Sequence, residues 1–166
     1  RTLSIRGDFV TQLTAPMKRQ SRTLTIVLHI ADIMGATFVD KTATLTGIAS
    51  QVNFKTNETM KPAALVKPDF KPDNGSGELK ASVELLGIIP EKNQILSFQL
   101  LYEKVGQQKN PINIQINLTE PLKSFNENKN IPMEVKCDLL DINGNISEWE
   151  IGEIEDKGSI EIIWGK

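Results

Sequence analysis

The sequence predicts an all-β chain that folds as one antiparallel β-sandwich over residues 1–166. Apolar residues recur with a period of two along most of the chain, and turn-forming residues separate these runs at hairpin spacing. No amphipathic helix of three turns occurs. With 166 residues, 39% of them hydrophobic and 24% charged, the chain can hold one hydrophobic core without a disulfide or metal. Uneven strand lengths favour a sandwich over a barrel.

The first confident strand covers residues 24–30, where Leu24, Ile26, Leu28 and Ile30 share one face. His29 points the other way and is expected on an exposed face rather than as a ligand. The same alternation predicts strands at 42–48, 78–86, 95–102, 112–118, 133–139, 146–151 and 160–164. Residues 120–125 favour one short helical turn.

The connections predict how these strands are joined. Asn-Gly within 142–145 is typical of a tight hairpin, and residues 90–93 are predicted to join two more antiparallel strands. Residues 57–76 are expected to be a long extended connection, because Lys-Pro recurs there at Lys61, Lys67 and Lys71. Prolines are expected only between strands or at their edges.

The N-terminal segment 1–22 carries Leu3, Ile5, Phe9, Val10 and Leu13. We predict that it pairs with the sheet as an edge strand, and that a second, unpaired edge contacts a neighbouring subunit. Two alternatives stay open: a tail without an assembly role, and the end of a preceding domain that the chain lacks.

Charge and ligand chemistry exclude several functions. The formal net charge is −2, and the short basic run at 17–22 is interpreted as a solvated loop, so no nucleic-acid partner is expected.

The single cysteine, Cys137, alternates with Val135 and Leu139 and is predicted to be buried and unreactive. One histidine and one cysteine form no zinc or copper site. Asp138, Asp141, Asn143 and Asn145 lack the spacing of a calcium loop and indicate a hairpin turn.

Catalysis is not predicted. No Ser–His–Asp set, nucleophile elbow or phosphate-binding loop occurs, and Glu148 and Glu150 lie on one strand face rather than across a cleft. Trp149 and Trp164 are expected to pack in the core, which argues against a carbohydrate platform. The sequence contains no run of eighteen apolar residues, so no membrane-spanning helix is predicted. We therefore expect that the protein is not an enzyme and that it has no catalytic residue, no cofactor and no bound metal.

Residues 42–58 read Thr-Ala-Thr-Leu-Thr-Gly-Ile-Ala-Ser-Gln-Val-Asn-Phe-Lys-Thr-Asn-Glu. This stretch resembles the FimB-type fimbrial-subunit lipoproteins of Bacteroidetes and their fimbrillin-like relatives, which carry a Leu-Ser/Thr-Gly-hydrophobic-Ala strand and an Asn-Leu-x-Thr-Gly-Glu turn. Phe54 replaces the usual Leu, and Asn57 replaces Gly. The matching residues are Leu45, Thr46, Gly47, Ile48, Ala49, Asn53, Thr56 and Glu58.

Four later stretches resemble further parts of that family, at 84–88, 96–102, 117–125 and 162–164, with Asn117 in place of Asp. The resemblance implies a transthyretin-like sandwich domain, usually one of two in tandem. It also implies a cell-surface protein of the fimbrium, held on the outer membrane by a lipid anchor outside this chain.

The expected function is that of a non-catalytic fimbrial anchor, accessory or adhesion subunit. It would act by protein–protein contact with other fimbrial or cell-surface proteins, through strand addition at a sheet edge. One alternative is a glycan-binding surface lipoprotein, which the sparse aromatics disfavour. The other is a hydrolase with a site assembled from several strands, which lacks a nucleophile–base set.

Overall fold

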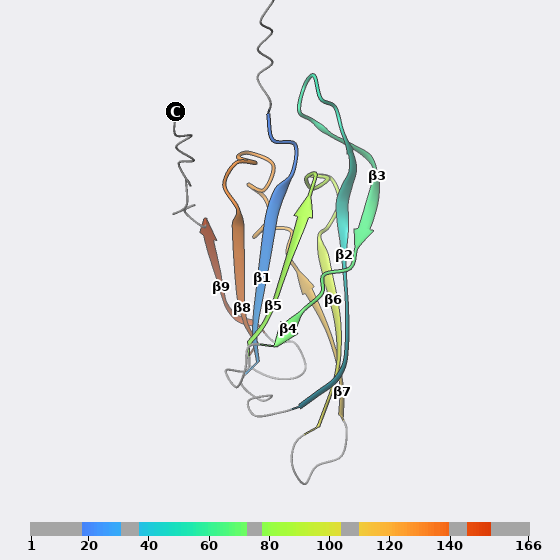
Figure 1. The fold of residues 1–166 in the computed structure, drawn as a ribbon, viewed down its shortest axis with the longest axis vertical. Coiled ribbons are helices and arrows are strands. Elements are labelled where there is room, and N and C mark those ends of the chain that lie inside the picture. The colour runs from blue at the N-terminus through green and yellow to red at the C-terminus, as the bar shows by residue number, and fades with distance from the viewer. Residues whose placement is uncertain (1–17, 31–36, 73–77, 104–109, 140–145, 154–166) are drawn as a thin grey trace, which may run out of the picture.

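A computed structural model describes residues 18–30, 37–72, 78–103, 110–139 and 146–153, and shows two packed β-sheets (Figure 1). One sheet has the order β4-β5-β1-β8-β9 and the other β3-β2-β6-β7. The predicted all-β sandwich is confirmed, and no described residue is helical. The strands are β1 (Arg22–Ile30), β2 (Thr37–Val52), β3 (Thr59–Val66), β4 (Lys71–Pro72), β5 (Glu78–Leu85), β6 (Ile95–Glu103), β7 (Asn110–Asn117), β8 (Met133–Leu139) and β9 (Ile146–Glu153).

The core lies between the two sheets and follows from the alternation of apolar residues. Leu24, Ile26, Leu28 and Ile30 of β1 are fully buried, as their shared face predicts. The opposing sheet supplies Phe98, whose ring packs edge-on against Phe70 at 5.2 Å between centroids. The described residues share this one hydrophobic core. The core also contains Leu45, Leu79, Leu96, Leu100, Ile114, Ile116, Met133, Val135, Cys137 and Leu139.

One strand pair departs from the predicted antiparallel arrangement. β1 pairs with β5 antiparallel but with β8 parallel, with Leu24 level with Met133 and Ile30 level with Leu139. Parallel neighbours need a long crossover, because the chain must return to the same end before the second strand starts. Residues 118–132 belong to this return. The predicted helical turn at 120–125 is a run of turns there, with Phe125 N donating to Leu122 O at 2.8 Å.

The prediction that residues 57–76 form a connection without strands is wrong, because β3 and β4 lie within it. Both are edge strands, and most β3 residues are exposed, so neither shows the buried–exposed alternation that reveals a strand. Pro62 lies in β3 and Pro72 in β4. The prolines are tolerated because an edge strand needs ladder bonds on only one side.

Residues 90–93 do not form the predicted hairpin, since β5 and β6 belong to different sheets. The chain crosses between the sheets along β2, where Ala49 N donates to Gly87 O and Ile89 N donates to Gly47 O, each at 2.9 Å. A Cβ on Gly47, whose φ is +74°, would lie 2.6 Å from Asn93 O. Glycine is therefore required where this crossing passes β2.

The other hairpin is supported by antiparallel pairing of β8 with β9, from Met133 opposite Glu153 to Leu139 opposite Ile146. Its turn lies outside the described residues. So do most of the N-terminal segment, residues 1–17, and the predicted strand 160–164.

Candidate functional site

The β2–β3 turn, residues 53–58, extends past the other described strands (Figure 1). Its conformation is fixed by its own polar groups. Asn53 Oδ1 accepts hydrogen bonds from Lys55 N at 2.9 Å and Thr56 N at 3.4 Å. Asn57 N donates to Asn53 O at 2.7 Å, and Asn57 has φ +62°, a left-handed conformation that asparagine tolerates. This turn is therefore held in one geometry rather than left as a loose loop.

Two further residues tie the turn to the body of the sandwich. Lys129 Nζ donates to Asn57 Oδ1 at 3.4 Å and to Gln20 O at 3.1 Å. Lys129 is 6% exposed, and burial lowers the pKa of its ammonium group. Thr59 Oγ1 donates to Ile88 O at 3.0 Å at the start of β3. These contacts connect the hairpin to the residues that precede β1, to the crossing between sheets and to the 118–132 return.

On this fixed hairpin, three large apolar side chains face water. Phe54 is 80% exposed, Leu65 52% and Met60 43%. We call Phe54, Met60 and Leu65 the hairpin surface. Fully burying one such side chain is worth about 1.5–3 kcal/mol, so leaving three of them in solvent forgoes a sizeable stabilisation. Exposed apolar side chains on a protruding hairpin are available for contact with a partner.

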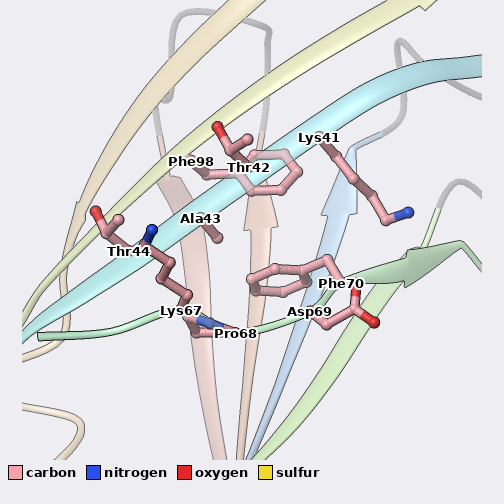
Figure 2. A pocket seen from close by; sticks show the side chains of 9 residues that line it. All are labelled: Lys41, Thr42, Ala43, Thr44, Lys67, Pro68, Asp69, Phe70 and Phe98. Carbon is pink, nitrogen blue, oxygen red and sulfur yellow. The ribbon is translucent and has the colours of Figure 1, made fainter.

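A pocket of about 340 Å³ lies between β2 and residues 67–70, the segment that leads from β3 to β4 (Figure 2). The rings of Phe70 and Phe98 lie at its centre, with Thr44 and Lys67 on one side and Lys41 on the other. Both rings are nearly inaccessible, at 1% and 0% exposed, so they form no stacking surface. The exposed and half-exposed groups here are polar: Lys41 and Lys67 are cationic, and Asp69 is anionic. The residues that line the pocket are Lys41, Thr42, Ala43, Thr44, Lys67, Pro68, Asp69, Phe70 and Phe98.

The outer face of the β5-β1-β8 strands holds a wider hollow of about 850 Å³ over Val27. Its charges are largely paired: Lys80 and Lys136 both approach Glu134, at 3.5 and 3.7 Å. On the same face His29 Nδ1 lies 2.9 Å from Asp138 Oδ1. His29 is thus a half-exposed face residue, as predicted. The paired charges leave this hollow without a net sign to select a ligand.

The residues considered for metal chemistry do not assemble. Within the described ranges, no three His, Cys, Asp or Glu side chains converge. Asp138 pairs with His29, and Asp141, Asn143 and Asn145 lie outside the described residues. The same holds for Trp164 and for the side chains of Glu148, Trp149 and Glu150.

Cys137 is buried, as predicted, and burial together with the nearby Asp138 charge raises the pKa of its thiol to about 12. In the part of the chain that the structure describes, no helix is long and apolar enough to cross a membrane. Cys137 is therefore a core residue.

Among the described residues, the hairpin surface and the pocket are the features best suited to binding a partner.

Sequence reasoning missed the hairpin surface because Met60 and Leu65 fall in the stretch interpreted as a connection. One signal in the sequence does point to the hairpin surface. Phe54 interrupts a run of turn-forming residues, and a turn offers a phenylalanine no core to enter.

Comparison with known proteins adds no relative. No family model, no curated protein and no solved structure matches this chain.

Proposed function

We propose that this chain is a non-catalytic surface subunit, a fimbrial anchor, accessory or adhesion protein that acts by protein–protein contact. Its partners would be other fimbrial or cell-surface proteins, and a lipid anchor outside this chain would hold it at the outer membrane. The observation that carries the proposal is the hairpin surface: a hydrogen-bonded turn holds Phe54 in solvent, and Met60 and Leu65 are exposed on the adjoining strand β3.

Rigidity supports a contact role. A turn already fixed by Asn53, Asn57 and Lys129 loses little conformational freedom when a partner covers it. An exposed aromatic side chain is also the kind of group that dominates binding energy at protein interfaces. Asn53, Thr56 and Glu58 supply hydrogen bonds of this turn, and they are also residues that carry the resemblance to fimbrillin-like proteins.

The proposal is tested in the source cells, in a strain whose own gene is deleted and replaced by variants. The wild-type protein should be accessible to added protease on intact cells and should co-sediment with sheared surface fibres. The double variant Phe54→Ser and Leu65→Ser should reduce co-sedimentation by about tenfold or more, a loss of roughly 1.4 kcal/mol or more in contact energy.

The matched control is Lys55→Ser, which changes an exposed side chain of the same turn without removing apolar surface. It should assemble like the wild type, and all variants should unfold within about 0.5 kcal/mol of one another. A protein confined to the cell interior, or a double variant that co-sediments normally, would refute the proposal.

The pocket favours glycan binding as a second candidate function. Lys41 and Lys67 flank it and could hold the carboxylate of an acidic sugar, whereas the buried Phe70 and Phe98 offer no stacking face for a neutral one. If this is the function, Lys67→Ala should abolish binding of acidic oligosaccharides measured by calorimetry, and Phe54→Ser should leave it unchanged.

A further inference from the structure

Four strands lie at sheet edges among the described residues: β3, β4, β7 and β9. An edge strand exposes unpaired backbone groups, and proteins usually protect such edges with lysine, proline, charge or short length. β3 contains Lys61-Pro62 beside a register shift between Ala49 and Gln51 of β2. β4 has only two residues, Lys71 and Pro72. β9 carries Glu148, Glu150 and Glu153 in its eight residues.

β7 has one proline near its start, Pro111, and none of these protections over its last six residues. After Pro111 its sequence is Ile-Asn-Ile-Gln-Ile-Asn over residues 112–117, with no charge, proline or glycine. Ile114 and Ile116 are buried in the core, whereas Asn113, Gln115 and Asn117 are exposed. A regular, uncharged edge in which isoleucine alternates with amide side chains is a template for another strand.

The register shows which β7 backbone groups are free. Leu118 N donates to Gln94 O at 2.7 Å, and Ile116 and Ile114 lie opposite Leu96 and Phe98 in the same alternation. In an antiparallel pair every second residue bonds to the partner strand. The N–H and C=O groups of Asn113, Gln115 and Asn117 therefore point away from β6. Pro111, which has no N–H, has the same outward parity, so its missing donor costs no bond to β6.

We propose that β7 pairs antiparallel with β7 of a second copy of this chain, with Gln115 opposite Gln115 and Asn113 opposite Asn117 about a two-fold axis. In this register the three outward residues each exchange two backbone hydrogen bonds with the partner. The two four-stranded sheets become one continuous sheet. The inference deepens the proposed function by assigning a partner to one edge, and it rests on that function only for its use in the cell.

The charges of the edge strands make β7 a better candidate for self-pairing than β3 or β9. In a two-fold pair each strand faces its own charges, so β9 would oppose carboxylates to carboxylates, and β3 would bring two copies of Lys61 to one seam. The amides of Asn113, Gln115 and Asn117 each donate and accept hydrogen bonds, so they complement a second set of themselves. A second copy also matches β7 in length.

Sedimentation of the full chain over a concentration series tests the proposal. The wild type should shift reversibly from the mass of one chain to twice that mass. Gln115→Lys places two ammonium groups opposite each other and should weaken dimerisation by about tenfold or more. Gln99→Lys makes the same change on an exposed residue of β6, one strand inward from the edge, and should dimerise like the wild type.

Two further variants test the register. Mixing Gln115→Lys with Gln115→Glu should restore dimers, because the opposed charges then attract. Gln115→Cys should form a disulfide-linked dimer under a mild copper oxidant, since opposed residues of a hydrogen-bonded pair have Cα atoms about 5.5 Å apart. Gln99→Cys should not, and the buried Cys137 should stay reduced.

The proposal is overturned if the wild type keeps the mass of one chain at every concentration. It is also overturned if Gln115→Lys and Gln99→Lys weaken dimerisation equally. Either result leaves the surface-subunit function standing if the cell assays succeed. A wild-type dimer in a protein found only inside cells would instead refute the function alone.

Discussion

At the scale of single residues, Cys137 shows how burial decides chemistry. Its side chain is 1% exposed, on the core face of β8 between Val135 and Leu139. Burial, and less so the Asp138 carboxylate, raises the pKa of the thiol from 9.0 to about 12. The neutral form is therefore retained far into the alkaline range, and the nucleophilic thiolate is scarce.

We expect a thiol reagent to label Cys137 at least about 100-fold more slowly in the native state than in denaturant, because labelling requires opening of the core. The folded pKa exceeds the unfolded value of 9.0. The neutral thiol's contribution to stability is therefore full below pH 9 and lost as the pH rises towards 12. Native labelling at pH 9 should stay slow. A native labelling rate within about tenfold of the rate in denaturant at the same pH would contradict the assignment.

At the scale of elements, Arg22 fastens β1 to the return that leads to β8. This side chain is 1% exposed. Its Nε donates to Ile131 O at 2.5 Å and its Nη1 to Phe125 O at 3.1 Å, while Cζ lies 5.4 Å from the centroid of the Phe125 ring. One buried guanidinium thus satisfies carbonyl groups of a segment without regular secondary structure, and so holds the crossover that the parallel β1–β8 pair requires.

Arg22→Met should lower the free energy of unfolding by about 3 kcal/mol, because it leaves buried carbonyl groups without donors. Urea denaturation followed by tryptophan fluorescence measures the loss. Lys123→Met, an exposed change on the same return, should stay within about 0.5 kcal/mol of the wild type. Equal effects from the two variants would show that Arg22 makes no special contribution.

At the scale of the whole molecule, the fold buries Phe98 between its two sheets and leaves Phe54 in water. Phe98 is 0% exposed between the sheets, and Phe54 is 80% exposed on the hairpin surface. The same residue type therefore serves stability at one position and, in the proposed function, contact at the other.

The same truncation should separate these roles. Phe98→Ala should cost about 3–5 kcal/mol, from lost burial and the cavity left beside Phe70. Phe54→Ala should change stability by less than about 0.5 kcal/mol. Chemical denaturation of both variants provides the measurement. A large loss at Phe54 would mean that the hairpin surface packs against the body of the protein and is not a free contact site.

Local pattern determined much of this protein. Alternation predicted most of the strands and their buried faces, including Cys137 inside and His29 outside, because the pleat fixes side-chain direction within each strand. The exposed edge strands β3 and β4 escaped prediction for the same reason: they bury too little to alternate.

Tertiary structure alone decided which strands are neighbours. The parallel β1–β8 pair, the crossing of 86–94 between sheets and the position of β7 at a sheet edge depend on contacts between residues distant in sequence. Likewise, the sequence placed Phe54 in a turn, but only the packing around Asn57 and Lys129 shows that it is held in solvent. The alternation of apolar residues is a property of a single strand. Strand pairing and side-chain exposure depend on which other segments of the chain pack beside that strand.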